Sequence, residues 1–129
     1  MFNADQYWIT VAEVKGFSNA AHRVLTPAEW DALTEYISIL PDRGDVISDC
    51  SGLRVVRWPA ASQGKNGHIR VVYYFRDLNT PVYLLALYEK GERLYLTSGE
   101  KRIIRELIEE IVSAYGIKWA ERLTSPGAA

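Results

Sequence analysis

Apolar residues along the chain change their spacing several times, and each change predicts a new structural element. A β-branched and aromatic run over residues 6–12 predicts a first strand, and apolar residues at helical spacing over 14–24 predict a short helix. Three further apolar runs predict strands, at residues 53–58, 69–76 and 82–88. Because the connections between these three runs are short, we expect the strands to pair in antiparallel fashion.

Two more helices carry clear start signals. Thr26-Pro27-Ala28-Glu29 combines an N-cap, a proline at the first helical position and a capping-box glutamate, and Pro41 ends the helix that follows. Thr97-Ser98-Gly99-Glu100 is a second capping box, placed before an apolar stripe over residues 103–112. Gly116 is the predicted C-cap of this last helix. Both helices are therefore expected to have one apolar face against a core.

The elements follow in the order β-α-α-β-β-β-α. This order predicts an α+β fold in which helices pack on one side of a small antiparallel sheet. The 129 residues and 14.6 kDa suit a single domain, 1–129, with enough chain to bury a core. Trp119 is expected to pack back onto the body of the protein, and the final six residues are expected to be frayed.

Composition excludes several classes of protein. The longest apolar run, 82–88, is too short to cross a bilayer, and no basic residue precedes Lys15 as a secretory signal would require. The one cysteine, Cys50, fits a reducing compartment. Two histidines and one cysteine, with no carboxylate cluster near them, argue against a metal site.

Charge is distributed unevenly along the chain, although the formal net charge is only −1. Residues 1–49 hold three basic and eight acidic side chains, and residues 77–129 hold seven basic and eight acidic ones. The segment between them has no acidic residue and five basic ones: Arg54, Arg57, Lys65, Arg70 and Arg76. A concentrated cationic surface on a nearly neutral protein predicts an anionic partner, with phosphate as the best candidate.

Four stretches resemble a known family when their order and spacing are taken together. They are Gly52-Leu53-Arg54-Val55-Val56-Arg57-Trp58, Gly64-Lys65-Asn66-Gly67, Arg70-Val71-Val72-Tyr73-Tyr74-Phe75, and Tyr83-Leu84-Leu85-Ala86-Leu87-Tyr88-Glu89-Lys90. In this order they resemble the HigB-like branch of RelE toxins, within the RelE/ParE superfamily of type II toxin–antitoxin modules. The resemblance covers residues 7–113, which leaves 114–129 as a C-terminal extension.

The resemblance implies a cytoplasmic endoribonuclease, an mRNA interferase, that cuts messenger in the ribosomal A site and so inhibits translation. It implies no cofactor and no membrane or metal, and its partners would be the ribosome, mRNA and a cognate antitoxin, a helix-turn-helix DNA-binding protein. In this chemistry the ribose 2′-hydroxyl attacks the adjacent phosphate, and the enzyme must stabilise an anionic phosphorane. Arginine suits that task because its planar donors match phosphate oxygens.

The resemblance assigns catalytic roles to three basic residues and RNA contacts to others. Arg70 would stabilise the phosphate in the transition state, Arg54 would handle substrate phosphate or proton transfer, and Lys90 would lie near the site. The implied RNA-binding residues are Arg57, Lys65, His68, Tyr74 and Arg76. Side-chain alternation places Arg54 and Arg57 on opposite faces of a regular strand, and Tyr74 and Arg76 with Arg70. Arg70 and Arg54 are thus the predicted phosphate-handling pair.

Two other functions stay open at this point. Arg54 shares its predicted strand face with Val56 and Trp58, so this face carries one charge where some RelE enzymes carry two or three, and Tyr95 is offset from the C-terminal tyrosine of some members. A ParE-type toxin that inhibits gyrase needs no nuclease residues, and a catalytically degenerate binding domain on the same scaffold needs none either. In the plainest interpretation, each arginine is a solvated charge at a strand edge.

Overall fold

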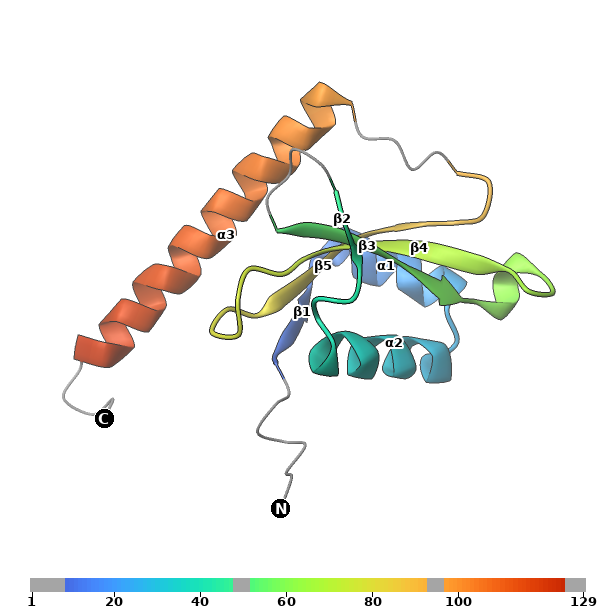
Figure 1. Ribbon diagram of the computed structural model, residues 1–129, viewed down its shortest axis with the longest axis horizontal. Helices are drawn as coiled ribbons and strands as arrows, with labels where there is room; N and C mark the ends of the chain where they lie inside the picture. Colours follow the sequence, from blue (N-terminus) through green and yellow to red (C-terminus); the bar gives the residue numbers. More distant parts are fainter. Residues whose placement is uncertain (1–8, 48–51, 93–96, 125–129) are drawn as a thin grey trace, which may run out of the picture. The chain divides into compact units, whose positions relative to one another are not determined.

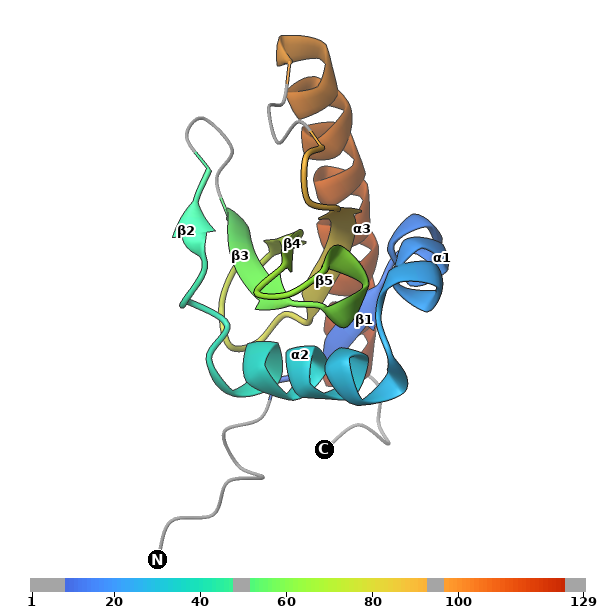
Figure 2. The ribbon, with the colours of Figure 1, turned by 90° about the vertical axis from the view of Figure 1, so that its right-hand side faces the viewer.

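The computed structural model describes residues 9–47, 52–92 and 97–124 (Figures 1 and 2). By its internal contacts the chain divides into two compact units, Met1–Leu94 and Tyr95–Ala129, and each is described by itself. The first unit contains β1 (Val11–Glu13), α1 (Lys15–Val24), α2 (Pro27–Ile39), β2 (Asp45–Val46), β3 (Leu53–Pro59), the 3₁₀ turn η2 (Ala61–Gln63), β4 (His68–Tyr74) and β5 (Val82–Tyr88). The second contains α3 (Ser98–Thr124).

The strands form one five-stranded mixed sheet in the order β1-β5-β4-β3-β2. Strands β3, β4 and β5 pair in antiparallel fashion, as their short connections predict, and β2 extends the sheet antiparallel to β3. β1 pairs with β5 in parallel. A register shift between Val72 and Tyr73 leaves Leu85 of β5 without a direct partner. The α+β class is confirmed, while the purely antiparallel sheet predicted from sequence is wrong in this one pairing.

One face of the sheet packs against α1 and α2. Its core side chains on β4 and β5 are Ile69, Val71, Tyr73, Val82 and Leu84, which cluster with Phe17, Ala21 and Val24 of α1 and Leu33 and Ile37 of α2. Figure 2 shows α2 beneath the strands and α1 beside β1 and β5. We call this the helix-covered face. Strand alternation sends every second side chain of β3 and β4 to the other face.

The N-terminus of α2 is fixed both locally and to the sheet. The predicted capping box is present, since the Thr26 hydroxyl accepts from the Glu29 N–H and the Glu29 carboxylate accepts from the Thr26 N–H. The second carboxylate oxygen of Glu29 accepts from the N–H of Ala61 at 2.8 Å. Trp58 of β3 donates its indole N–H to the Glu29 carbonyl at 3.1 Å. Glu29 thus joins α2 to β3 and to the turn after β3.

Replacing Glu29 with glutamine is expected to make unfolding easier by about 1 kcal/mol at neutral pH, because the charged cap is lost. Backbone hydrogen bonding, mainly to Thr26, holds the pKa of the Glu29 carboxyl below its ordinary value of 4.5. Its stabilising contribution is therefore complete above pH 4.5 and is lost as the pH falls through the folded-state pKa. Urea unfolding at pH 7 and at low pH measures both effects, and the variant and the natural protein should converge in acid.

Glu35→Gln is the control for this experiment, because Glu35 is an exposed carboxylate on the same helix. A Glu29→Gln protein whose stability falls in acid as steeply as that of the natural protein would contradict the assignment.

Several element boundaries differ from the sequence-based expectation. The first strand covers only Val11–Glu13, and positions 6–8 of the predicted strand lie outside the described residues. β4 ends at Tyr74, two positions earlier than predicted. The two-residue strand β2 was not predicted, because Asp45 and Val46 carry no alternating pattern of their own. They are strand by virtue of their pairing with Val55 and Arg54.

The second unit is one long helix. The capping box at its start is confirmed, since Thr97 and Glu100 exchange side-chain-to-backbone hydrogen bonds of 3.0 and 3.1 Å. The predicted stop at Gly116 is wrong, because α3 continues to Thr124. The side chain of Trp119 and the final residues 125–129 lie outside the described part of the structure. Within the described residues, no helix is both long enough and apolar enough to span a membrane.

Candidate nucleic-acid interface

Strand register brings two arginines directly opposite each other. Arg57 of β3 pairs with Arg70 of β4, and Arg70 pairs in turn with Tyr88 of β5. Directly opposed residues share a face of a sheet. Ile69 and Val71, which flank Arg70, belong to the helix-covered face, so Arg57, Arg70 and Tyr88 lie on the opposite face. We call this cross-strand set the arginine row.

Arg57 is exposed, and none of the described acidic residues forms an ion pair with it. Its Nη2 lies 3.4 Å from Nδ1 of His68, at the start of β4. Because a guanidinium can only donate, Nδ1 of His68 must be the acceptor in this contact. Within the described residues the one ion pair joins Arg76 and Asp77, at 3.7 Å. The positive charge of Arg57 is thus not neutralised within the described part of the chain.

Arg70 is held by the turn that follows β5. Its Nη2 donates to the carbonyl of Glu89 at 3.0 Å and to the carbonyl of Glu92. The turn is itself stabilised by the Glu92 carboxylate, which accepts from the Glu89 N–H at 2.7 Å. Both acceptors of Arg70 are neutral backbone groups, and Arg70 makes no ion pair within the described residues. Nε and Nη1 have no acceptor within the described residues.

Gln63 of η2 links this turn to the loop between β3 and β4. Its Nε2 donates to the Glu89 carboxylate at 3.2 Å, and its Oε1 accepts from the Lys90 N–H at 2.6 Å. Gln63 therefore helps to position the two carbonyls that hold Arg70. Sequence reasoning gave this residue no role, and a glutamine in a polar loop carries no signal that would have indicated one.

A hollow of 380 Å³ lies beside Arg57. It is lined by Arg57, Trp58 and Pro59 from β3, by Asn66 and Gly67 from the loop, and by His68 at the start of β4. Arg57 and His68 supply polar donors, and Trp58 and Pro59 supply apolar surface. This combination of a cation with flat apolar groups suits a nucleotide, whose phosphate and base need both kinds of contact.

Arg54 does not belong to this surface. It pairs with Tyr73, on the helix-covered face, and its Nη1 donates to the carbonyls of Asp42 and Gly44, each at 2.9 Å. The predicted opposition of Arg54 and Arg57 holds, but the predicted pair of Arg70 with Arg54 is wrong in geometry. Arg57, not Arg54, is the neighbour of Arg70, and Arg54 anchors the loop after α2.

The other predicted residues lie at varied positions around the sheet. Lys65 is exposed in the loop between β3 and β4, and Lys90 is exposed in the turn after β5. Tyr74 shares the face of Arg70 by alternation, yet it is buried, and burial raises the pKa of its phenol. Arg76 lies beyond the end of β4 and pairs with Asp77. Tyr74 is thus a poor candidate for stacking on a base.

Tyr88 is a member of the arginine row to which sequence reasoning gave no function. Its place opposite Arg70 depends on the register of β4 with β5, which includes the irregularity at Val72 and Tyr73.

Within the described residues, no three His, Cys, Asp or Glu side chains gather in a way that could hold a metal ion. No model of a known protein family matches the chain.

Proposed function

We propose that this protein is a ribosome-dependent endoribonuclease toxin of the RelE type, with the arginine row and His68 as its RNA-binding surface. The observation that carries the proposal is the direct opposition of Arg57 and Arg70, neither of which forms an ion pair with a carboxylate in the described part of the chain. Like charges placed directly opposite each other on a sheet destabilise it. A bound phosphate would neutralise this repulsion. The relief of repulsion would then add to the favourable free energy of phosphate binding.

The two guanidinium groups supply the charge that RNA cleavage needs. When a 2′-hydroxyl attacks the neighbouring phosphate, negative charge builds up on the phosphorane oxygens, and fixed donors aimed at these oxygens lower the barrier. Arg57 offers an exposed donor fork, and Arg70 offers Nε and Nη1 while its Nη2 is held by the turn. Lys65 and Lys90, both exposed, would contact the RNA backbone around the site.

We further propose that the protein is cytoplasmic and that a cognate antitoxin binds it. The arginines of the arginine row make no ion pair within the described residues, and an acidic antitoxin would cover such a cationic surface until the antitoxin is displaced. A neighbouring reading frame that encodes a small helix-turn-helix protein would support the assignment.

Mapping of messenger 5′ ends after brief induction tests the function itself. We expect cuts phased to the ribosomal A site. Unphased cuts would mean a nuclease that acts without the ribosome, and they would contradict the proposal. Intact messenger with inhibited supercoiling would instead support a ParE-type toxin.

A catalytically degenerate binding domain is the second candidate, and one observation favours it. Nη2 of Arg70 is already bound by two carbonyls, so part of the guanidinium is committed to structure. Intact messenger, intact supercoiling and unimpaired growth after induction would support this alternative.

A further inference from the structure

Strand β1 is at the edge of the described sheet, and two of its three residues direct their backbone N–H and C=O groups away from its partner β5. Val82 donates its N–H to the carbonyl of Thr10, and Val14 donates its N–H to the carbonyl of Leu84. In a parallel ladder with this register, positions 10, 12 and 14 bond to β5, whereas Val11 and Glu13 direct their N–H and C=O groups to the outer edge. Such an edge is a template for another strand.

At one end of the outer edge a backbone group is already hydrogen-bonded, whereas the groups that follow along this edge have no partner in the described part of the chain. The N–H of Ile9 points the same way as those of Val11 and Glu13, and it donates to the carbonyl of Ser38, near the end of α2, at 3.0 Å. No described residue accepts a hydrogen bond from the N–H of Val11 or Glu13. The stretch from Val11 to Glu13 thus presents main-chain groups that are available for pairing.

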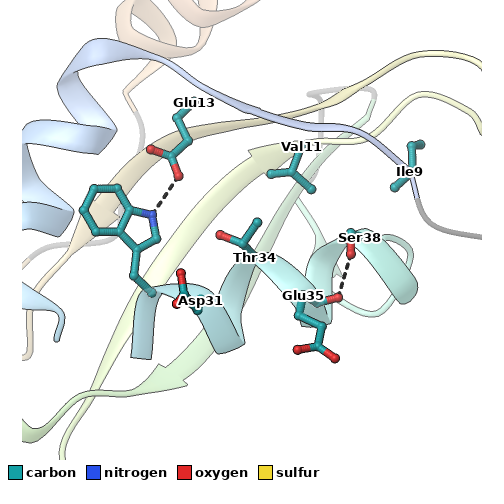
Figure 3. A pocket seen from close by; sticks show the side chains of 8 residues that line it. Ile9, Val11, Glu13, Asp31, Thr34, Glu35 and Ser38 are labelled. Atoms are coloured by element: carbon teal, nitrogen blue, oxygen red, sulfur yellow. Dashed lines mark hydrogen bonds between the residues drawn. The ribbon is translucent and has the colours of Figure 1, made fainter. Parts of the chain in front are cut away.

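A groove of 510 Å³ runs between this edge and α2 (Figure 3). It combines apolar side chains with three carboxylates and has no basic residue; it is lined by Ile9, Val11, Glu13, Trp30, Asp31, Thr34, Glu35 and Ser38. The Glu13 carboxylate is fixed by hydrogen bonds of 2.7 Å from the indole of Trp30 and from the Ser18 hydroxyl. Asp31 and Glu35 are exposed on α2. The groove is therefore acidic, and part of its lining is apolar.

We propose that the outer edge of β1 and the acidic groove bind an extended segment of a partner protein in which lysine or arginine alternates with apolar residues. The segment would add a strand to the sheet beside Val11 and Glu13. Because alternate side chains of a strand point to opposite faces, the basic side chains would lie on the groove side and the apolar ones on the other face. The aliphatic parts of the basic side chains would contact Val11 and Trp30, and their charged ends would face Asp31 and Glu35. This surface is distinct from the arginine row, and the proposal does not depend on RNA cleavage.

Charge decides between possible occupants. RNA is disfavoured because its phosphates would meet three carboxylates with no cation among the groove residues. A second copy pairing edge to edge would bring the same acidic groups together, which is also unfavourable. A basic strand satisfies both the unpaired main-chain groups and the carboxylates.

Titration of the full chain with a synthetic peptide of about seven alternating lysine and valine residues tests the proposal. Amide hydrogen exchange followed by NMR is the readout. In the free protein the amides of Val11 and Glu13 should exchange fast, whereas those of Ala12 and Val14, which bond to β5, should be protected. Bound peptide should protect Val11 and Glu13 as well.

Two matched controls separate strand addition from charge attraction. The same peptide with alternate backbone nitrogens methylated keeps its charge but cannot pair, and it should leave both amides unprotected. A double Asp31→Lys, Glu35→Lys variant should weaken the binding of the unmodified peptide about tenfold. Asp45→Lys, on β2 at the opposite edge of the sheet, should bind it as the natural protein does.

Three results would overturn the proposal. The first is protection of Val11 and Glu13 in the protein without peptide, or a concentration-dependent dimer that protects them, because the edge would then be occupied by other means. The second is peptide binding by the Asp31→Lys, Glu35→Lys variant that is as tight as binding by the natural protein. The third is no binding at all.

Discussion

Replacing Arg70 with alanine is expected to lower the rate of messenger cleavage in translating ribosomes by about 100-fold or more, the usual effect of removing one donor to a developing oxyanion. Arg57→Ala is expected to lower it by a similar factor, because the two residues are cross-strand partners and would share one phosphate. Single-turnover cleavage of messenger in programmed ribosomes measures both rates. The stability of Arg57→Ala should be unchanged or higher by about 0.5 kcal/mol, since a like-charge pair is removed.

Arg43→Ala is the charge-matched control. Arg43 is exposed in the loop after α2, and its replacement removes the same single positive charge. It should retain nearly the full rate. Equal losses in Arg43→Ala and Arg57→Ala would mean that only net charge matters, and full activity in both arginine-row variants would rule out the proposed site. Arg70→Lys keeps the charge but loses the planar donor fork, so it should recover little of the rate.

The elements with local signals were predictable from sequence. The start of α2 depends on Thr26 and Glu29, three positions apart, and the same pattern at Thr97 and Glu100 begins α3. Both interactions are completed within one helical turn, so no knowledge of tertiary structure is needed. The three long strands were placed to within two residues because each is a mainly apolar segment that contributes side chains to the same core.

The candidate site depends on register, which sequence patterns do not specify here. Alternation along β3 correctly separated Arg54 from Arg57, but it could not say which of them faces the same way as Arg70. A shift of one residue between β3 and β4 would have put Arg54 on the face of Arg70 and Arg57 on the other. The loop that sets this register contains η2 and the Gln63 contacts, none of which is visible as a motif.

Side-chain contacts to backbone atoms could not be predicted from the sequence either. Arg54 is bound by the carbonyls of Asp42 and Gly44, and any residues at those positions would present the same carbonyls. The parallel pairing of β1 with β5 joins segments about 70 residues apart, beyond the reach of arguments from short connections. α3 continues through Gly116 because a helical glycine costs only about 1 kcal/mol, which a long helix tolerates.

Tyr73 occupies a position where one oxygen atom is expected to decide much of the stability. Its side chain is fully buried on the helix-covered face, and its hydroxyl donates to the carbonyl of Pro41 at 2.7 Å and accepts from the N–H of Gly44 at 2.8 Å. The packing leaves no room, since a Cβ at Gly44 would lie 2.5 Å from this hydroxyl. Tyr73 therefore ties β4 to the loop that follows α2, the same loop that Arg54 holds.

Tyr73→Phe is expected to lower the free energy of unfolding by about 2 kcal/mol, because two buried backbone groups lose their partner and no water replaces it. Urea denaturation at pH 7 gives the value. Tyr74→Phe is the matched control, since Tyr74 is the next residue and is also buried, but its hydroxyl has no hydrogen bond within the described residues. A loss of equal size in the two variants would contradict the role of the Tyr73 hydroxyl.

The same substitution has a signature at high pH. Burial raises the pKa of Tyr73 above its ordinary value of 10.0, because the phenolate would be poorly solvated in the core. A raised folded-state pKa means that the contribution of this tyrosine to stability is complete below pH 10.0 and is lost as the pH rises through the folded-state pKa. The stability of Tyr73→Phe should therefore fall less steeply above pH 10 than that of the natural protein, so the difference between them narrows in alkali. A difference that stays constant with pH would mean that the Tyr73 hydroxyl has the same pKa in the folded and unfolded protein, and it would contradict a pKa raised by burial.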